Sequence, residues 1–128
     1  MMTPITTAAA PAAIGPYSQG VVSGRLLFVS GQLPIDPTSG ELVRGDAVAQ
    51  IRQCLANIAA IARKAGSDLS HTVKTTILIT DIQAFAAINE EYGKAFASPY
   101  PARTCYEVSA LPKGALVEVE AVIEVAAS

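Results

Sequence analysis

The chain has 128 residues and a formal net charge of −2, and its charged residues make up 16% of the sequence. That fraction lies below the roughly 25% of an average soluble protein, while hydrophobic residues reach 51%. We therefore expect a single domain over residues 1–128 that buries part of its apolar surface against further copies of itself. No block of Lys or Arg is present, so the composition argues against a nucleic-acid partner.

The first 24 residues contain no charged side chain, which raises the question of a signal peptide or membrane segment. Three prolines interrupt this stretch, and threonine and alanine stand where such a segment carries leucine. Cys54 and Cys105 fall in separate predicted elements without the spacing of a disulfide framework. We therefore expect a cytoplasmic protein that has no membrane partner.

The hydrophobic period changes several times along the chain. Residues 21–30 predict two short strands that turn at Ser23 and Gly24, and the prolines and glycine between positions 34 and 40 predict a loop. A helix is predicted next, with Asp46 as its N-cap and Gly66 just beyond its end. Its apolar residues recur at intervals of three and four: Val48, Ile51, Leu55, Ile58, Ala62 and Ala65.

Alternation over residues 73–80 then predicts a strand, with Val73, Thr75, Ile77 and Ile79 on one face. Asp81 is expected to cap a second helix, which the prolines at positions 99 and 101 bring to an end. The apolar stripe of this helix consists of Phe85, Ile88, Tyr92 and Phe96.

A short strand around Arg103 and a last strand over residues 117–125 complete the order β-β-α-β-α-β-β. This order predicts an α+β fold, a mixed sheet with two helices packed on one face. The other face, which we call the outer face, combines threonines with Leu78, Glu118, Glu120 and Val122. It is too apolar for full exposure and too polar for a core, so we expect neighbouring subunits to cover it.

Residues 100–105, Tyr-Pro-Ala-Arg-Thr-Cys, place one arginine and one thiol on a predicted strand. The planar fork of Arg103 suits bidentate binding of a carboxylate or phosphate, and an internal salt bridge to one of the acids is the structural alternative. Cys105 is either a thiolate nucleophile, activated by the neighbouring cation, or a small buried side chain.

Several other chemistries find no support. His71 is the single histidine, which excludes a histidine-clustered metal site and argues against a Ser-His-Asp triad. The glycines form neither a phosphate-binding loop nor a dinucleotide-binding turn, so no nucleotide cofactor is implied.

The sequence resembles the RidA family of reactive-intermediate deaminases, also known as the YjgF type. The segments that carry the resemblance occur in the family's order and span nearly the whole chain: residues 12–19 (Ala-Ala-Ile-Gly-Pro-Tyr-Ser-Gln), 29–32 (Val-Ser-Gly-Gln), Asn89 with Tyr92, 101–105 (Pro-Ala-Arg-Thr-Cys), and 111–114 (Leu-Pro-Lys-Gly) leading into 117–120 (Val-Glu-Val-Glu). The connection at residues 97–100 looks tighter than in many members.

This resemblance implies a chorismate-mutase-like α+β fold, a homotrimer, and sites in the clefts between subunits. The implied activity is cofactor-free hydrolysis of small 2-imino acids, such as 2-iminopropanoate and 2-iminobutanoate with their enamine tautomers, to 2-keto acids and ammonia. A non-catalytic ligand-binding or chaperone-like trimer and an endoribonuclease are the alternative functions.

The resemblance also implies residue roles. Arg103 is expected to bind the substrate carboxylate, Glu118 to position the attacking water, and Cys105 to contribute largely through its backbone. The substrate-binding positions also include Tyr17, Ser30, Gly31 and Asn89. For Tyr17 a packing role is the alternative, and for Asn89 a hydrogen-bonded position at the helix edge.

Overall fold

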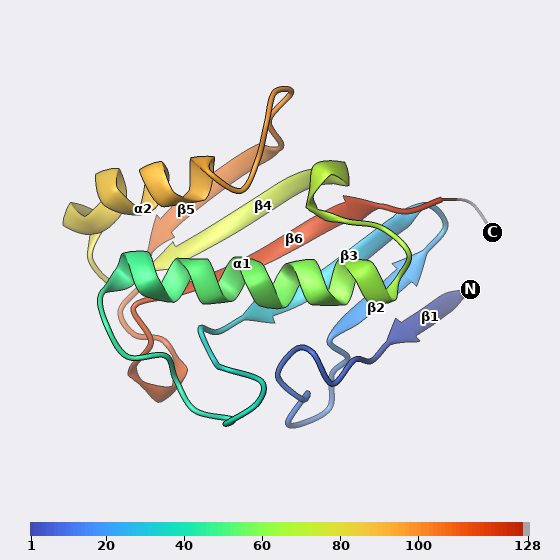
Figure 1. Ribbon diagram of the computed structural model, residues 1–128, viewed down its shortest axis with the longest axis horizontal. Coiled ribbons are helices and arrows are strands. Elements are labelled where there is room, and N and C mark those ends of the chain that lie inside the picture. Colours follow the sequence, from blue (N-terminus) through green and yellow to red (C-terminus); the bar gives the residue numbers. More distant parts are fainter. Residues whose placement is uncertain (127–128) are drawn as a thin grey trace.

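The computed structural model describes residues 1–126 and contains one six-stranded sheet with two α-helices (Figure 1). The elements, in chain order, are β1 Met2–Ile5, β2 Gly20–Ser23, β3 Leu26–Gln32, α1 Ala47–Lys64, β4 Thr72–Ile79, α2 Phe85–Gly93, β5 Ala102–Glu107 and β6 Val117–Glu124. Three short 3₁₀ turns lie at Leu69–His71, Ile82–Ala84 and Pro112–Gly114.

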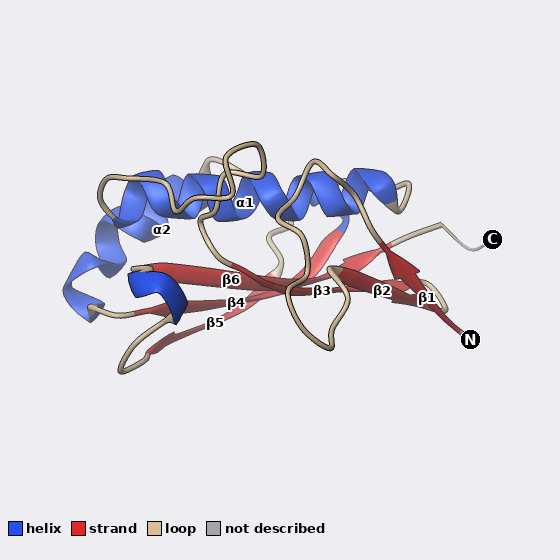
Figure 2. Cartoon of the chain, turned by 90° about the horizontal axis from the view of Figure 1, so that it is seen from below, coloured by secondary structure: helices blue, strands red, loops and turns tan. Residues whose placement is uncertain are grey.

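The strands follow the order β1-β2-β3-β6-β4-β5 across the sheet. All neighbours are antiparallel except β4 and β5, which run parallel, as expected for two strands joined through a helix. Both α-helices lie on the same face of the sheet, and neither covers the outer face (Figure 2). The predicted α+β fold is thereby confirmed.

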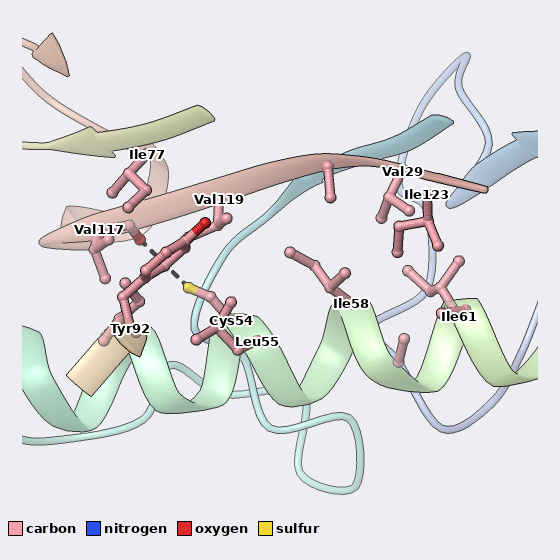
Figure 3. Close-up of a cluster of buried hydrophobic side chains, with 14 of the residues drawn as sticks. Val29, Cys54, Leu55, Ile58, Ile61, Ile77, Tyr92, Val117, Val119 and Ile123 are labelled. Carbon is pink, nitrogen blue, oxygen red and sulfur yellow. Dashed lines mark hydrogen bonds between the residues drawn. The ribbon is translucent and has the colours of Figure 1, made fainter. Parts of the chain in front are cut away.

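The core lies between the helices and the sheet. Figure 3 shows Ile58 and Ile61 of α1 facing Val29 and Ile123 of the sheet. Every second residue of β6 from Val117 to Ile123 is buried, which confirms the alternation read from the sequence. The predicted limits of α1 also hold. The Asp46 carboxylate accepts a hydrogen bond from Ala49 N at 3.0 Å, and Gly66 follows the helix with a φ of +82°.

Three details of the prediction were wrong. β1 was not predicted; it is a strand of four residues that contains a proline and pairs only with β2. A register shift between Thr72 and Lys74 turns Val73 outward, although alternation predicted that it points into the core. Asp81 caps the 3₁₀ turn Ile82–Ala84 that leads into α2, and the helix already ends at Gly93, ahead of both prolines.

A β-bulge interrupts β3 near its end. Val29 pairs with Ala121 and Gln32 pairs with Val119, so β3 uses one residue more than β6 over the same interval. Ser30 and Gly31 are the residues inside this bulge. Bulges re-aim side chains and are common next to active sites.

Neither helix within residues 1–126 combines the length and the apolar character needed to cross a membrane.

Asn57 provides a test of how α1 holds the loop after β3. Its side chain is 1% exposed, and its amide donates to the carbonyls of Leu33 at 3.2 Å and Ile35 at 2.9 Å. Asn57→Ala leaves both partly buried carbonyls without this donor and should lower the free energy of unfolding by about 1–3 kcal/mol. Urea denaturation measures the change. Gln53→Ala, which removes only a donor to the Asn57 side chain, should cost clearly less, and equal costs would contradict the anchoring role.

Candidate functional site

Arg103 lies on β5 at the open edge of the sheet. It aligns with the buried Thr75 of β4, so its side chain lies on the side of the sheet that the helices cover. Its Nη1 donates a hydrogen bond to Asn89 Oδ1 at 2.5 Å. Its guanidinium carbon lies 5.1 Å from the ring centroid of Tyr92 and 5.5 Å from that of Phe85. Two aromatic rings and one amide therefore fix the orientation of the guanidinium.

The Arg103 guanidinium has further N–H groups that can donate hydrogen bonds to a ligand. No carboxylate among residues 1–126 lies within 4.0 Å of it, so the alternative of an internal salt bridge is not found there. A hollow of about 430 Å³ opens beside the guanidinium, lined by Asn89, Tyr92, Gly93, Tyr100, Pro101 and Arg103. The Tyr92 hydroxyl shares a buried hydrogen bond of 2.7 Å with Thr75, which holds this wall in place. The arrangement suits a small anion that accepts two parallel hydrogen bonds.

Glu118 occupies the outer face of the sheet. It aligns with Leu78 of β4, and its side chain is half-buried. Burial raises the pKa of the Glu118 carboxyl above its ordinary value, and the negative charge of Glu120 raises this pKa further. A carboxylate with a raised pKa accepts a proton more readily near neutral pH, which is the property of a general base.

A second hollow, of about 720 Å³, lies over Glu118. Tyr17, Ser30 and Gly31 line it together with Glu118 and Glu120, and Lys113 of the turn before β6 stands at the same hollow. The structure thus brings together three of the predicted substrate-binding residues and the predicted water-positioning glutamate. Its walls come from β3, β6 and the segment before β2.

Gln19 is a residue of this region that the sequence analysis missed. Its side chain is 3% exposed, accepts a hydrogen bond from Thr7 N at 2.7 Å, and donates to three carbonyls of residues 7–11. The adjoining Ser18 carbonyl accepts a hydrogen bond from the Ser30 hydroxyl. The Gln19 side chain thus holds residues 7–11 against the segment that carries Tyr17, and the Ser30 hydrogen bond attaches that segment to β3. The signal in the sequence was its place at the end of segment 12–19, which carries the family resemblance, but residue type alone does not distinguish a buried glutamine there from an exposed one.

Cys105 aligns with Ile77 of β4 and packs against the core on the helix side. Burial raises the pKa of the Cys105 thiol, and the positive charge of Arg103 offsets this only in part. The thiol is therefore protonated at neutral pH, which favours a passive wall over a thiolate nucleophile.

The sheet divides the predicted site residues into two groups. Arg103, Cys105 and Asn89 lie on the helix side near the β5 edge, whereas Glu118 and the residues around it lie on the outer face. One chain therefore does not place the carboxylate-binding arginine and the water-positioning glutamate in a common pocket.

Comparisons with known proteins agree with this architecture. The family model described as Endoribonuclease L-PSP matches residues 7–125. A RutC family protein of Sinorhizobium fredii is 63% identical, over 96% of this chain and 98% of that protein. A protein of Capra hircus named 2-iminobutanoate/2-iminopropanoate deaminase is 52% identical, over 92% of this chain and 86% of that protein. A solved structure of a conserved Rid family protein of Yersinia pestis has a TM-score of 0.95 and 47% identity, covering 98% of this chain and 100% of that one.

The fold of this chain, a mixed sheet with both helices on one face, is thus shared with solved structures of Rid proteins. The chain belongs to the Rid family, whose family model carries the Endoribonuclease L-PSP description, and its resemblance to RidA is confirmed.

The raised pKa of Glu118 leads to a prediction about stability. Because folding raises this pKa, the ionised carboxylate destabilises the native state at neutral pH, and this penalty disappears as pH falls through the folded pKa to the unfolded value. Glu118→Gln should therefore melt at a higher temperature than the wild type at pH 7, with a smaller difference at pH 4. Calorimetry at both pH values measures this. Glu124→Gln, an exposed position on the same strand, serves as the control. A lower melting temperature of Glu118→Gln at pH 7 would contradict the burial of its charge.

Proposed function

We propose that the protein is a cofactor-free hydrolytic deaminase that converts small 2-imino acids, such as 2-iminopropanoate and 2-iminobutanoate, into 2-keto acids and ammonia. The observation that carries this proposal is the Arg103 guanidinium, which is held by Asn89 and two aromatic rings and has no carboxylate partner within residues 1–126. A 2-imino acid supplies the missing partner, a carboxylate directly beside the reactive carbon. The names of relatives at about half identity support the same activity.

Arg103 would fix the substrate by its carboxylate. Two parallel hydrogen bonds from a rigid fork leave the substrate little rotational freedom, so the C=N carbon takes a reproducible position. The hollow of about 430 Å³ beside the guanidinium accommodates a substrate of few carbons. Both features are compatible with a small 2-imino acid as the substrate.

Glu118 would act on the water. Its carboxylate accepts a proton from the water while the water oxygen attacks the C=N carbon and the C=N π electrons move to nitrogen. The tetrahedral intermediate then carries a hydroxyl and an amino group on one carbon. Protonation of the nitrogen allows the C–N bond to break, ammonia leaves, and the hydroxyl loses its proton as the C=O bond of the 2-keto acid forms. A protonated imine is already electrophilic, so these steps need no metal or organic cofactor.

The sheet separates the two groups, so a second copy of the chain would complete the site. The outer face is the surface available for this contact, since it exposes Phe28 and Tyr17 beside the hollow that contains Glu118. A partner that docks its β5 edge there would bring its own Arg103 toward this Glu118. We propose a homotrimer with its sites between subunits, because closed rotational symmetry repeats one such contact without leaving an unpaired face.

The family description raises the alternative of an endoribonuclease. The hollow on the outer face is lined by two glutamates against one lysine, Lys113. This charge distribution repels a phosphate backbone and disfavours ribonuclease activity. A trimer that only binds ligands would need Arg103 but has no use for a half-buried Glu118 with a raised pKa.

The direct test adds the purified protein to a serine or threonine dehydratase reaction and follows the decay of the released imine. Faster decay and a matching rise in ammonia are expected. Decay at the rate of the uncatalysed reaction would rule the proposal out.

Arg103→Lys tests the carboxylate clamp. Lysine keeps the charge but donates from a single point, so the variant should lose about 2–5 kcal/mol of transition-state stabilisation, measured as kcat/KM in the same assay. Arg25→Lys, the same change in the exposed hairpin turn, is the matched control and should leave kcat/KM unaltered. If Arg103→Lys retained the wild-type kcat/KM, bidentate binding of the substrate carboxylate by Arg103 would be ruled out as a contribution to catalysis.

A further inference from the structure

The bulge in β3 places Gly31 directly against the carboxylate of Glu118. A methyl group added at the Cα of Gly31 would lie 2.9 Å from Cδ and 2.9 Å from Oε2 of Glu118, and 3.4 Å from its Cγ. Side-chain carbons in proteins essentially never approach other atoms below 3.0 Å. The Glu118 carboxylate therefore occupies space that any other residue at position 31 would fill.

Backbone conformation does not account for a glycine at this position. Six other glycines of the described chain have positive φ values that favour glycine, and Gly31 is not among them. Core packing does not account for it either. At Gly20 the nearest side-chain atoms belong to Ile61 and Leu27, whereas at Gly31 they all belong to Glu118. Glycine weakens a strand interior, so its presence here points to the close approach of another group.

We propose that Gly31 is a positioning residue for Glu118. Because Gly31 has no side chain, the bulge leaves a space beside its Cα, and the carboxylate of the water-positioning Glu118 occupies this space, which we call the seat. This inference rests on the proposed deaminase function. It goes beyond the role implied by family resemblance, in which Gly31 lines the substrate pocket. The charged side chains that share the hollow with Glu118 are Glu120 on the same strand and Lys113 in the turn before it.

Gly31→Ala is the informative variant, because alanine keeps the backbone N–H and adds only the methyl group. The carboxylate should swing out of its seat and lose its burial, so its pKa, followed by ¹³C NMR of the Glu118 carboxyl, should fall toward that of a free glutamate. A displaced base costs about tenfold to hundredfold in kcat/KM, and the acid limb of the pH profile should move to lower pH together with the NMR titration.

Glu118→Asp supplies the matched double-mutant cycle. In aspartate the carboxyl carbon stands where Glu118 has Cγ, at 3.4 Å from the added methyl group, and rotation about the Cβ–Cγ bond can turn both oxygens away from the methyl group, so the steric conflict is smaller. The loss caused by Gly31→Ala should therefore be clearly smaller in the Glu118→Asp background than in the wild type. If Gly31→Ala is insoluble while the double variant folds, the conflict lies with the carboxylate and the proposal is supported.

Three results would overturn the proposal. The first is a Gly31→Ala protein with an unchanged Glu118 titration and unchanged kcat/KM, and the second is a cycle in which the two losses simply multiply. The third is failure of both the single and the double variant to fold, which would locate the constraint in the backbone. The NMR titration needs no turnover, so it still tests the seat if the wild type proves inactive as a deaminase, and in that case only the proposed function fails.

Discussion

The strict alternation of side chains across a β-sheet is the constraint on which the rest of this protein depends. β4 aligns Thr75 with Arg103 on one side and Leu78 with Glu118 on the other, so the two charged groups face opposite sides of one sheet. Neither can turn to the other face without a register slip that would also expose the core. This geometry gives a common reason for a half-site at the β5 edge, a half-site on the outer face, and an outer face with too much apolar surface for water. The association of identical chains that we propose would satisfy all three.

The parts of the fold with a sustained hydrophobic period could be predicted from the sequence. The apolar pattern of α1 repeats over several helical turns, and the alternation of β6 repeats over several residue pairs. In each element one face is buried, so the pattern alone predicts the element and its buried face. The errors fall where a local irregularity or a distant partner decides the outcome. β1 exists only through its pairing with β2, and Val73 points outward because of a register shift in β4. Hydrophobic period contains no information about either.

The candidate site divides in the same way. Its charged and aromatic members could be proposed from residue type and family resemblance, but the contacts that orient them could not. The guanidinium of Arg103 is held by rings 11 and 18 positions earlier in the chain, those of Tyr92 and Phe85. Gly31 meets Glu118 only because β3 contains a bulge, and Gln19 holds a loop through carbonyls whose positions depend on tertiary structure. Such contacts depend on register, which no single stretch of sequence specifies.

The central claim is that Arg103 of one chain acts with Glu118 of another. Co-expression of Arg103→Ala and Glu118→Gln chains under two different affinity tags, followed by tandem purification, yields mixed assemblies whose size light scattering measures. If each site takes its arginine and its glutamate from different subunits, about one third of the sites are intact, because tandem purification retains only trimers that contain both chains, and each such trimer has one contact that joins an intact Arg103 to an intact Glu118. We expect mixed trimers that hydrolyse imine at about one third of the wild-type rate, while each variant alone stays nearly inactive. Mixed trimers no more active than the separate variants would place both residues in a single-chain site and contradict the account.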